Sequence, residues 1–163
     1  MKSLLILLLP LAFTCNIYSQ SNQLLIGVTG FTSTEMDVSP QVRFRHYLNS
    51  GSHRFGLGLN YSQNHFMDVA DEYTPEVALL YSFSYNLSGS SIYTAIGPSL
   101  LYRFNANPKS KISRGFLGSQ LAVGYNFTDF LIELNYLLVP SEIESDGFFS
   151  GRSTLGFGLG YQF

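Results

Sequence analysis

The chain has 163 residues, enough for one domain, and only 12% of them are charged, against about 25% in an ordinary soluble domain. Aromatic residues make up 15% of the chain, and the net charge of −2 gives no basic surface for nucleic acid. Low charge is typical of a membrane protein, yet beyond the N-terminus no apolar run approaches the roughly 20 residues that a spanning helix needs. Because only helices and closed barrels satisfy the backbone in lipid, the composition favours a barrel.

The N-terminal segment is typical of a secretory signal. Lys2 supplies the positive charge, and the apolar core from Leu4 to Phe13 is too short for a transmembrane helix. We expect cleavage after Ser19, so that residues 1–19 are removed and residues 20–163 form the barrel domain. The only cysteine, Cys15, lies in the removed segment. Lipidation of Cys15 is the alternative, although the residues before it do not match a lipoprotein signal.

Alternation with a period of two residues predicts eight strands, because successive side chains of a strand point to opposite faces. In chain order the strands are expected at 23–31, 41–48, 54–62, 76–85, 92–104, 118–127, 132–138 and 155–163. The last one is the clearest, because large apolar residues occupy every odd position and Gly or Gln every even one between Leu155 and Phe163. Strands near ten residues, even in number and alternating in polarity, are the marks of a transmembrane barrel.

The expected connections alternate in length. Short segments rich in turn residues lie at 49–53, 86–90 and 128–129, and longer polar segments at 32–38, 63–74, 105–114 and 141–147. Eight strands place all the short turns at the same end as the two termini. We expect that end to be periplasmic and the longer loops to be extracellular.

The alternative of a soluble barrel requires a charged outer face. Here the face opposite the apolar one consists mainly of Gly, Ser, Asn and Gln and has no lysine, so it suits a narrow barrel interior better than a solvent-exposed surface. The sequence therefore predicts an all-β fold, an eight-stranded antiparallel up-and-down transmembrane β-barrel.

A set of charged residues falls on the polar face of the predicted strands. Its members are Arg43, Arg45, Arg54, Glu76, Arg103, Glu133 and Arg152. An eight-stranded barrel is only just wide enough for side chains to fill, so we expect a paired, hydrogen-bonded network in the lumen. A narrow channel for small solutes or ions, biased towards anions by the arginine excess, is the alternative.

The case for catalysis is weak. His65 lies near Ser62 and several carboxylates, the residue types that acyl transfer uses, and small barrel enzymes modify lipid A at the membrane surface. The chain nevertheless lacks the compact His-X-Ser-Asn stretch of the deacylases. We expect no enzyme activity, no catalytic residue, no metal and no cofactor, and the lipid A-modifying enzyme stays an alternative. Pro98 interrupts its strand and indicates either a bulge or a lateral opening.

The C-terminal strand, with Leu159, Tyr161 and the terminal Phe163, looks like the insertion signal of bacterial outer-membrane barrels. With its length and strand pattern, the mature chain resembles the small outer-membrane barrel family typified by OmpA and OmpX. The resemblance implies a monomeric barrel that the outer-membrane assembly machinery inserts among outer-membrane lipids and lipopolysaccharide. Members of the family are structural, adhesive, surface-protective or small-solute proteins, and we expect a structural or surface-interaction role.

Overall fold

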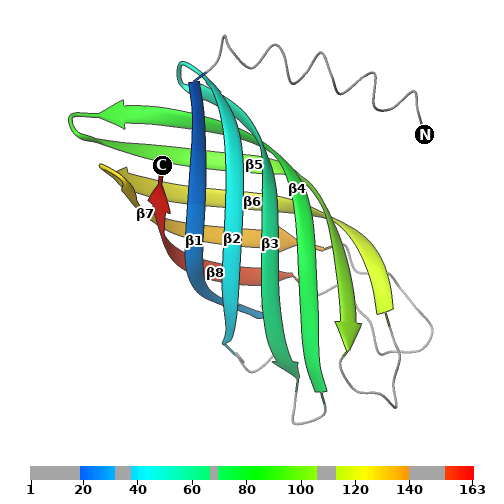
Figure 1. Ribbon diagram of the computed structural model, residues 1–163. Coiled ribbons are helices and arrows are strands. Elements are labelled where there is room, and N and C mark those ends of the chain that lie inside the picture. The colour runs from blue at the N-terminus through cyan, green and yellow to red at the C-terminus, as the bar shows by residue number, and fades with distance from the viewer. Residues whose placement is uncertain (1–18, 32–37, 67–69, 106–112, 140–152) are drawn as a thin grey trace, which may run out of the picture.

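The computed structural model describes residues 19–31, 38–66, 70–105, 113–139 and 153–163, which form one closed antiparallel barrel (Figure 1). Each strand pairs with its neighbours in sequence, and β1 closes the barrel against β8. The strands are β1 (Ser19–Phe31), β2 (Ser39–Ser50), β3 (His53–Phe66), β4 (Ala70–Leu87), β5 (Ser90–Asn105), β6 (Ser113–Phe127), β7 (Phe130–Leu138) and β8 (Thr154–Gln162). The predicted fold class is confirmed. No helix in the described ranges is long and apolar enough to cross a membrane.

The two faces of each strand differ in polarity. On β7, Glu133 and Asn135 point inward and are 0% and 1% exposed, whereas Ile132 and Leu134 point outward and are 48% and 55% exposed. The same alternation runs around the whole barrel, so that apolar side chains cover its outside. A fold that turns its apolar residues outward on every strand is suited to lipid, not to water.

The termini and the three tight turns lie at one end of the barrel. The turns centre on residues 51–52, 88–89 and 128–129, and Gly51 and Gly89 adopt the positive φ that such hairpins require. Thr128 also has a positive φ, of 55°, and its hydroxyl donates a 2.6 Å hydrogen bond to the Phe127 carbonyl. At this end the backbones of Asn22 and Phe163 exchange two hydrogen bonds, which fasten the C-terminus to β1.

The predicted loop 63–74 is wrong over most of its length. β3 and β4 remain paired from Gln63 with Tyr73 to Phe66 with Ala70, which leaves only residues 67–69 between the strands. The polar residues of this segment gave no apolar alternation to recognise. The hydrogen bonds of a backbone ladder do not require apolar outward side chains, so the ladder continues without that pattern. The predicted loop 105–114 is shorter for the same reason, since β5 reaches Asn105 and β6 begins at Ser113.

Within the described strands, the residue-by-residue pairing is interrupted only at the seam between β4 and β5. Pairs are missing where Gly97 and Pro98 face β4, and again where Pro75 faces β5, while the register is the same on both sides of each gap. A bulge would shift the register, so neither proline forms one. The cause is the missing N–H of proline, which removes a ladder hydrogen bond. The strands stay close, because a Cβ on Gly97 would lie 1.7 Å from the Leu79 carbonyl oxygen.

This seam is expected to exchange its amide hydrogens first. Each lost ladder bond removes about 1 kcal/mol of local stability, so amides of Leu79 and Leu80 should exchange about fivefold faster than those of Leu121 and Val123 on the uninterrupted β6. Nuclear magnetic resonance of the barrel in detergent micelles measures both rates in one sample. Equal rates on the two seams would contradict the expectation.

Candidate functional site: the polar interior

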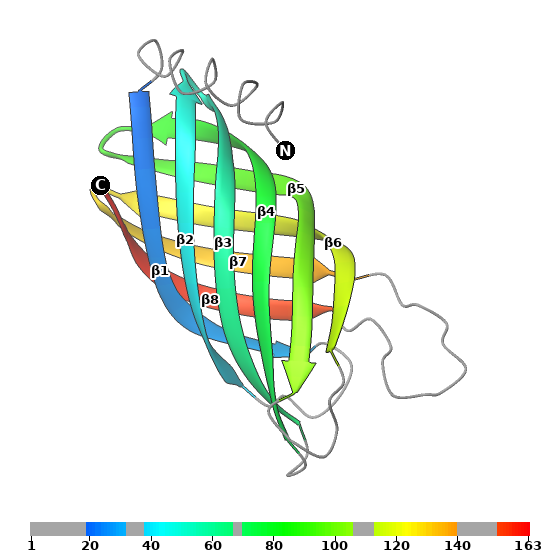
Figure 2. The same cartoon turned by 45° about the vertical axis from the view of Figure 1, so that its right-hand side comes forward.

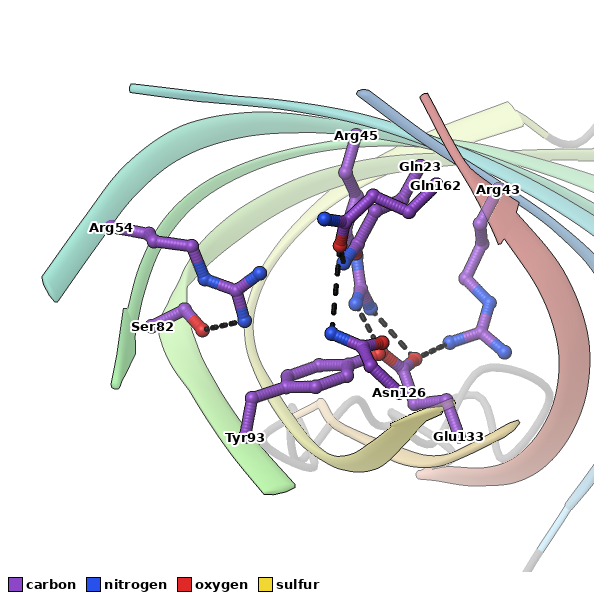
Figure 3. A network of polar contacts seen from close by, with 9 residues as sticks. All are labelled: Gln23, Arg43, Arg45, Arg54, Ser82, Tyr93, Asn126, Glu133 and Gln162. Carbon is purple, nitrogen blue, oxygen red and sulfur yellow. Dashed lines mark hydrogen bonds and ion pairs between the residues drawn. The ribbon is translucent and has the colours of Figure 1, made fainter. Parts of the chain in front are cut away.

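The centre of the barrel holds a buried ion-pair cluster (Figure 3). Glu133 of β7 pairs with Arg43 and Arg45, which follow each other on the inner face of β2. Arg45 Nη2 also donates a 2.9 Å hydrogen bond to Glu133 Oε1. The three side chains are at most 1% exposed. One carboxylate therefore balances two buried guanidinium groups from the facing wall.

Aromatic side chains extend this cluster. The Tyr93 hydroxyl donates a 2.6 Å hydrogen bond to Glu133 Oε2. The Arg54 guanidinium lies 5.0 Å from the ring centroids of both Tyr93 and Tyr47, and its Nη2 donates to Ser82 Oγ at 3.1 Å. The positive charge of Arg54 is thus stabilised by two ring faces and one hydroxyl, whereas a carboxylate stabilises the charges of Arg43 and Arg45.

Glycines provide the space for the two inward tyrosine rings. A Cβ on Gly124 would lie 2.2 Å from Tyr93 Cζ, and a Cβ on Gly56 would lie 2.6 Å from Tyr47 Cδ1. Each ring therefore lies in contact with a glycine, Gly124 of β6 for Tyr93 and Gly56 of β3 for Tyr47. These glycines serve packing, and no helix follows them that would hold a phosphate.

Replacing Gly124 by alanine is expected to destabilise the barrel by about 1–3 kcal/mol, because the added methyl group displaces the Tyr93 ring and its bond to Glu133. Gly115→Ala is the matched control on the same strand, since nothing lies within 4 Å of a Cβ there. Urea titration in phospholipid vesicles compares the two variants. A Gly124→Ala variant as stable as Gly115→Ala would show that the ring has room to move.

A layer of amides lies between the central cluster and the end that carries the termini. Gln23 donates to Gln162 Oε1 at 3.1 Å, and Asn126 approaches the same oxygen at 3.5 Å and Ser91 Oγ at 3.3 Å. These residues come from β1, β8, β6 and β5, so the layer connects strands on opposite walls (Figure 3).

Towards the loop end the interior becomes less polar. Glu76 accepts a 2.8 Å hydrogen bond from Asn60, and the Arg103 guanidinium lies 5.3 Å from the Phe116 ring centroid. Phe116 belongs to an apolar cluster at this end. Its members are Leu101, Phe116, Leu137 and Val139. The described interior is therefore filled along its length by an amide layer, an ion-pair cluster and an apolar cluster.

Six of the seven predicted lumenal charges lie inside the barrel and are buried. Of these, the structure brings Arg43, Arg45 and Glu133 into ion pairs and places Arg54 beside them, whereas Glu76 and Arg103 lie nearer the loop end. Arg152 falls outside the described residues. Four buried arginines thus face two buried glutamates in the described interior.

A small cavity borders this cluster on the loop side. It is too narrow to hold a water molecule, and Arg43, Asn60, Glu76 and Gln120 contribute to its lining. Arg43 Nη2 and Glu76 Oε1 are both buried and have no hydrogen-bond partner among the described residues. The interior is narrow here, and its charged groups are not fully paired.

The residues of the predicted insertion signal all point outward. Leu159, Tyr161 and Phe163 are 56%, 45% and 62% exposed. The Tyr161 ring contacts Phe130 and Phe163, with centroids 5.7 and 6.3 Å apart. These three outward residues thus give the terminal end of β8 an apolar and aromatic edge.

The histidines form no common site in the described structure. His46 Nδ1 donates to Asn22 Oδ1 at 2.9 Å, and His53 Nδ1 lies 2.7 Å from the Tyr81 hydroxyl, both on the outer side of the barrel. The backbone of His65 pairs with that of Asp71, while the side chains of both lie outside the described residues. Within the described ranges no three His, Cys, Asp or Glu residues are arranged to hold a metal ion.

Sequence reasoning missed several partners in this interior, among them Tyr47, Ser82 and Gln23. Each lies on the inward parity of its strand, so the alternation that located the arginines also located these positions. Parity gives Tyr47 the same inward direction as Arg45, but it does not show which side chains meet across the lumen.

Comparison with known proteins identifies the fold. No family model and no curated protein matches the sequence. Among solved structures, Neisserial surface protein A (NspA) superposes with a TM-score of 0.67 at 11% identity over 88% of this chain and 94% of NspA. The N-terminal β-barrel domain of Pseudomonas aeruginosa OprF gives 0.55 at 15% identity over 88% and 97%. The outer membrane enzyme PagL gives 0.57 at 10% identity over 87% and 97%.

This likeness concerns architecture. The chain has the fold of the small eight-stranded outer-membrane barrels, in agreement with the resemblance inferred from its sequence. At 10–15% identity the similarity carries no residue roles from one protein to another.

Proposed function

We propose that the mature chain is an integral outer-membrane barrel with a structural or surface-interaction role, with periplasmic termini and extracellular loops. The observation that carries this proposal is the difference between the two faces of the barrel. The outer face is apolar and exposed, whereas the inner face carries buried side chains that fill the interior. Such a barrel contributes an anchored scaffold, and its longer connections supply the contacts outside the membrane. In this role Glu133, Arg43 and Arg45 stabilise the lumen and need no ligand.

Signal removal and insertion belong to the same proposal. Cleavage after Ser19 would leave Gln20 as the first residue of β1, which begins at Ser19 in the uncleaved chain. The outward edge of Leu159, Tyr161 and Phe163 would then serve the assembly machinery during insertion. Outer-membrane lipids and lipopolysaccharide would surround the folded monomer.

The test is fractionation combined with electrophoresis of unboiled and boiled samples. We expect the protein in outer-membrane fractions and expect the unboiled form to migrate faster, because a closed barrel with buried ion pairs resists detergent at room temperature. A soluble periplasmic protein without a mobility shift would overturn the proposal and favour a soluble ligand-binding barrel.

A narrow channel is the second candidate. It is favoured by the unpartnered Arg43 Nη2 and Glu76 Oε1 beside the cavity and by the excess of buried arginine. Conductance of the purified protein in a planar bilayer separates the two roles. The filled interior leads us to expect no steps, and reproducible anion-selective steps would make the channel the leading function.

An enzyme remains the least supported candidate. Its discriminating measurement is the mass spectrum of lipid A from cells with and without the protein. We expect no mass shift. A shift in the wild type that disappears in His65→Ala would replace the scaffold role with lipid modification.

A further inference from the structure

A row of aromatic side chains lies on the outside of the barrel at the loop end of β3, β4 and β5. This outer aromatic row consists of Tyr61, Tyr73, Tyr102 and Phe104. Its ring centroids are 6.2 Å apart from Tyr61 to Tyr73, 5.4 Å from Tyr73 to Phe104, and 6.3 Å from Phe104 to Tyr102. Tyr61 and Tyr102 are each 47% exposed, and Phe104 is 36% exposed. Four rings from three strands thus form one continuous surface.

Along the barrel axis, Phe104 and Tyr73 lie beyond the band of outward apolar side chains that faces the hydrocarbon layer in such barrels. Ile92 is the first outward apolar residue of β5 at the terminal end, and Phe104 follows it by about 12 residues, or ~40 Å of strand. With strands tilted by about 40°, that length spans ~30 Å along the barrel axis. The apolar band of such barrels is about 25 Å tall. Phe104, and Tyr73 paired with it, therefore stand about 5 Å into the headgroup layer.

The wall that carries the row is also taller than the opposite wall. The β5–β6 ladder continues to Phe104 with Ser113, whereas the β6–β7 ladder ends at Ser119 with Leu138. Figure 2 shows β5 and β6 extending beyond the loop-side ends of β7 and β8. The paired strands β3, β4 and β5 thus hold these aromatic rings beyond the level at which β7 and β8 end.

We propose that the outer aromatic row binds the saccharide headgroup of a glycolipid in the leaflet at the loop end. This proposal rests on the proposed outer-membrane location, which puts a glycolipid leaflet on that side. Ring faces stack against the C–H faces of sugar rings, and tyrosine hydroxyls donate to sugar hydroxyls while the ring bodies stay in an apolar environment. Acyl chains do not reach this height. The row itself carries no cation, so sugar rings fit it better than phosphate groups.

A second aromatic cluster provides a matched control at the other end. Phe130, Tyr161 and Phe163 form it with comparable ring spacings and 45–66% exposure. It would lie in the phospholipid leaflet and should not distinguish glycolipid from phospholipid.

The experiment titrates the folded full-length protein in detergent with lipopolysaccharide that carries only lipid A and inner-core sugars. Tyr73→Leu combined with Phe104→Leu keeps apolar side chains at both positions and removes two ring faces, and we expect at least threefold weaker binding, since stacking on a sugar needs a flat ring. Phe127→Leu combined with Phe130→Leu, at paired outward positions of the other end and outside the predicted insertion signal, should bind as the wild type does. Phe104→Leu alone serves if the double variant does not fold, and a smaller weakening is expected from it.

Three outcomes would overturn the proposal. These are equal binding by the row and control variants, an equal loss of affinity for phospholipid micelles, and binding that disappears when the lipid A phosphates are removed. The last would indicate phosphate recognition by other groups. The electrophoretic shift of the same samples reports separately on the barrel, and absence of the wild type from outer-membrane fractions would refute the proposed function first.

Discussion

Glu133→Gln is expected to lower the free energy of unfolding by about 3–5 kcal/mol, because it leaves two buried guanidinium groups without a counter-charge. Arg43 and Arg45 are each only 1% exposed, so water cannot replace the lost carboxylate. Tyr93 would also donate to a weaker, uncharged acceptor. Urea titration in phospholipid vesicles measures the loss, with tyrosine fluorescence and the electrophoretic shift as signals, since the chain has no tryptophan.

Glu76→Gln is the matched control for this prediction. Glu76 is also buried, but it forms no ion pair with the described arginines, and an amide oxygen can still accept the hydrogen bond from Asn60, so we expect a change of no more than about 1 kcal/mol. Replacing Arg43 and Arg45 by Met together with Glu133→Leu should restore most of the lost stability, because an apolar cluster needs no counter-charge. A Glu133→Gln barrel with the wild-type urea midpoint would show that the arginines find other partners.

The strands and their faces were predictable from sequence because most outward positions carry an apolar side chain. Ile132 and Leu134 lie on the outer face, Glu133 and Asn135 on the inner face, and a period of two records the difference. Near the loop end this regularity stops. The outer parts of β3 and β4 continue as hydrogen-bonded strands without the pattern, so their extent was underestimated.

The partners inside the barrel were not predictable, for a different reason. The alternation along each strand shows that Arg43, Arg45 and Glu133 point inward. Which of these side chains meet depends on how far β2 is displaced along the barrel axis relative to β7. This displacement is set by the pairing registers of all the strands that lie between them around the barrel. The position of Arg54 between two tyrosine rings depends likewise on small residues, such as Gly124, on a strand far away in sequence.

Leu134→Arg tests whether the outer face meets lipid, and it is expected to cost about 2–4 kcal/mol. Leu134 is the central residue of β7 and is 55% exposed on the outside, so its side chain would lie near the middle of the bilayer. Leu138→Arg, at the loop end of the same strand and 49% exposed, should cost only about 0–1 kcal/mol, because arginine reaches the interface there. Urea titration in phospholipid vesicles measures both. A soluble barrel would respond in the opposite sense, since arginine on a water-facing strand costs little at any height. Equal and small effects at the two positions would therefore refute the membrane location, and with it the docking of glycolipid on the outer aromatic row.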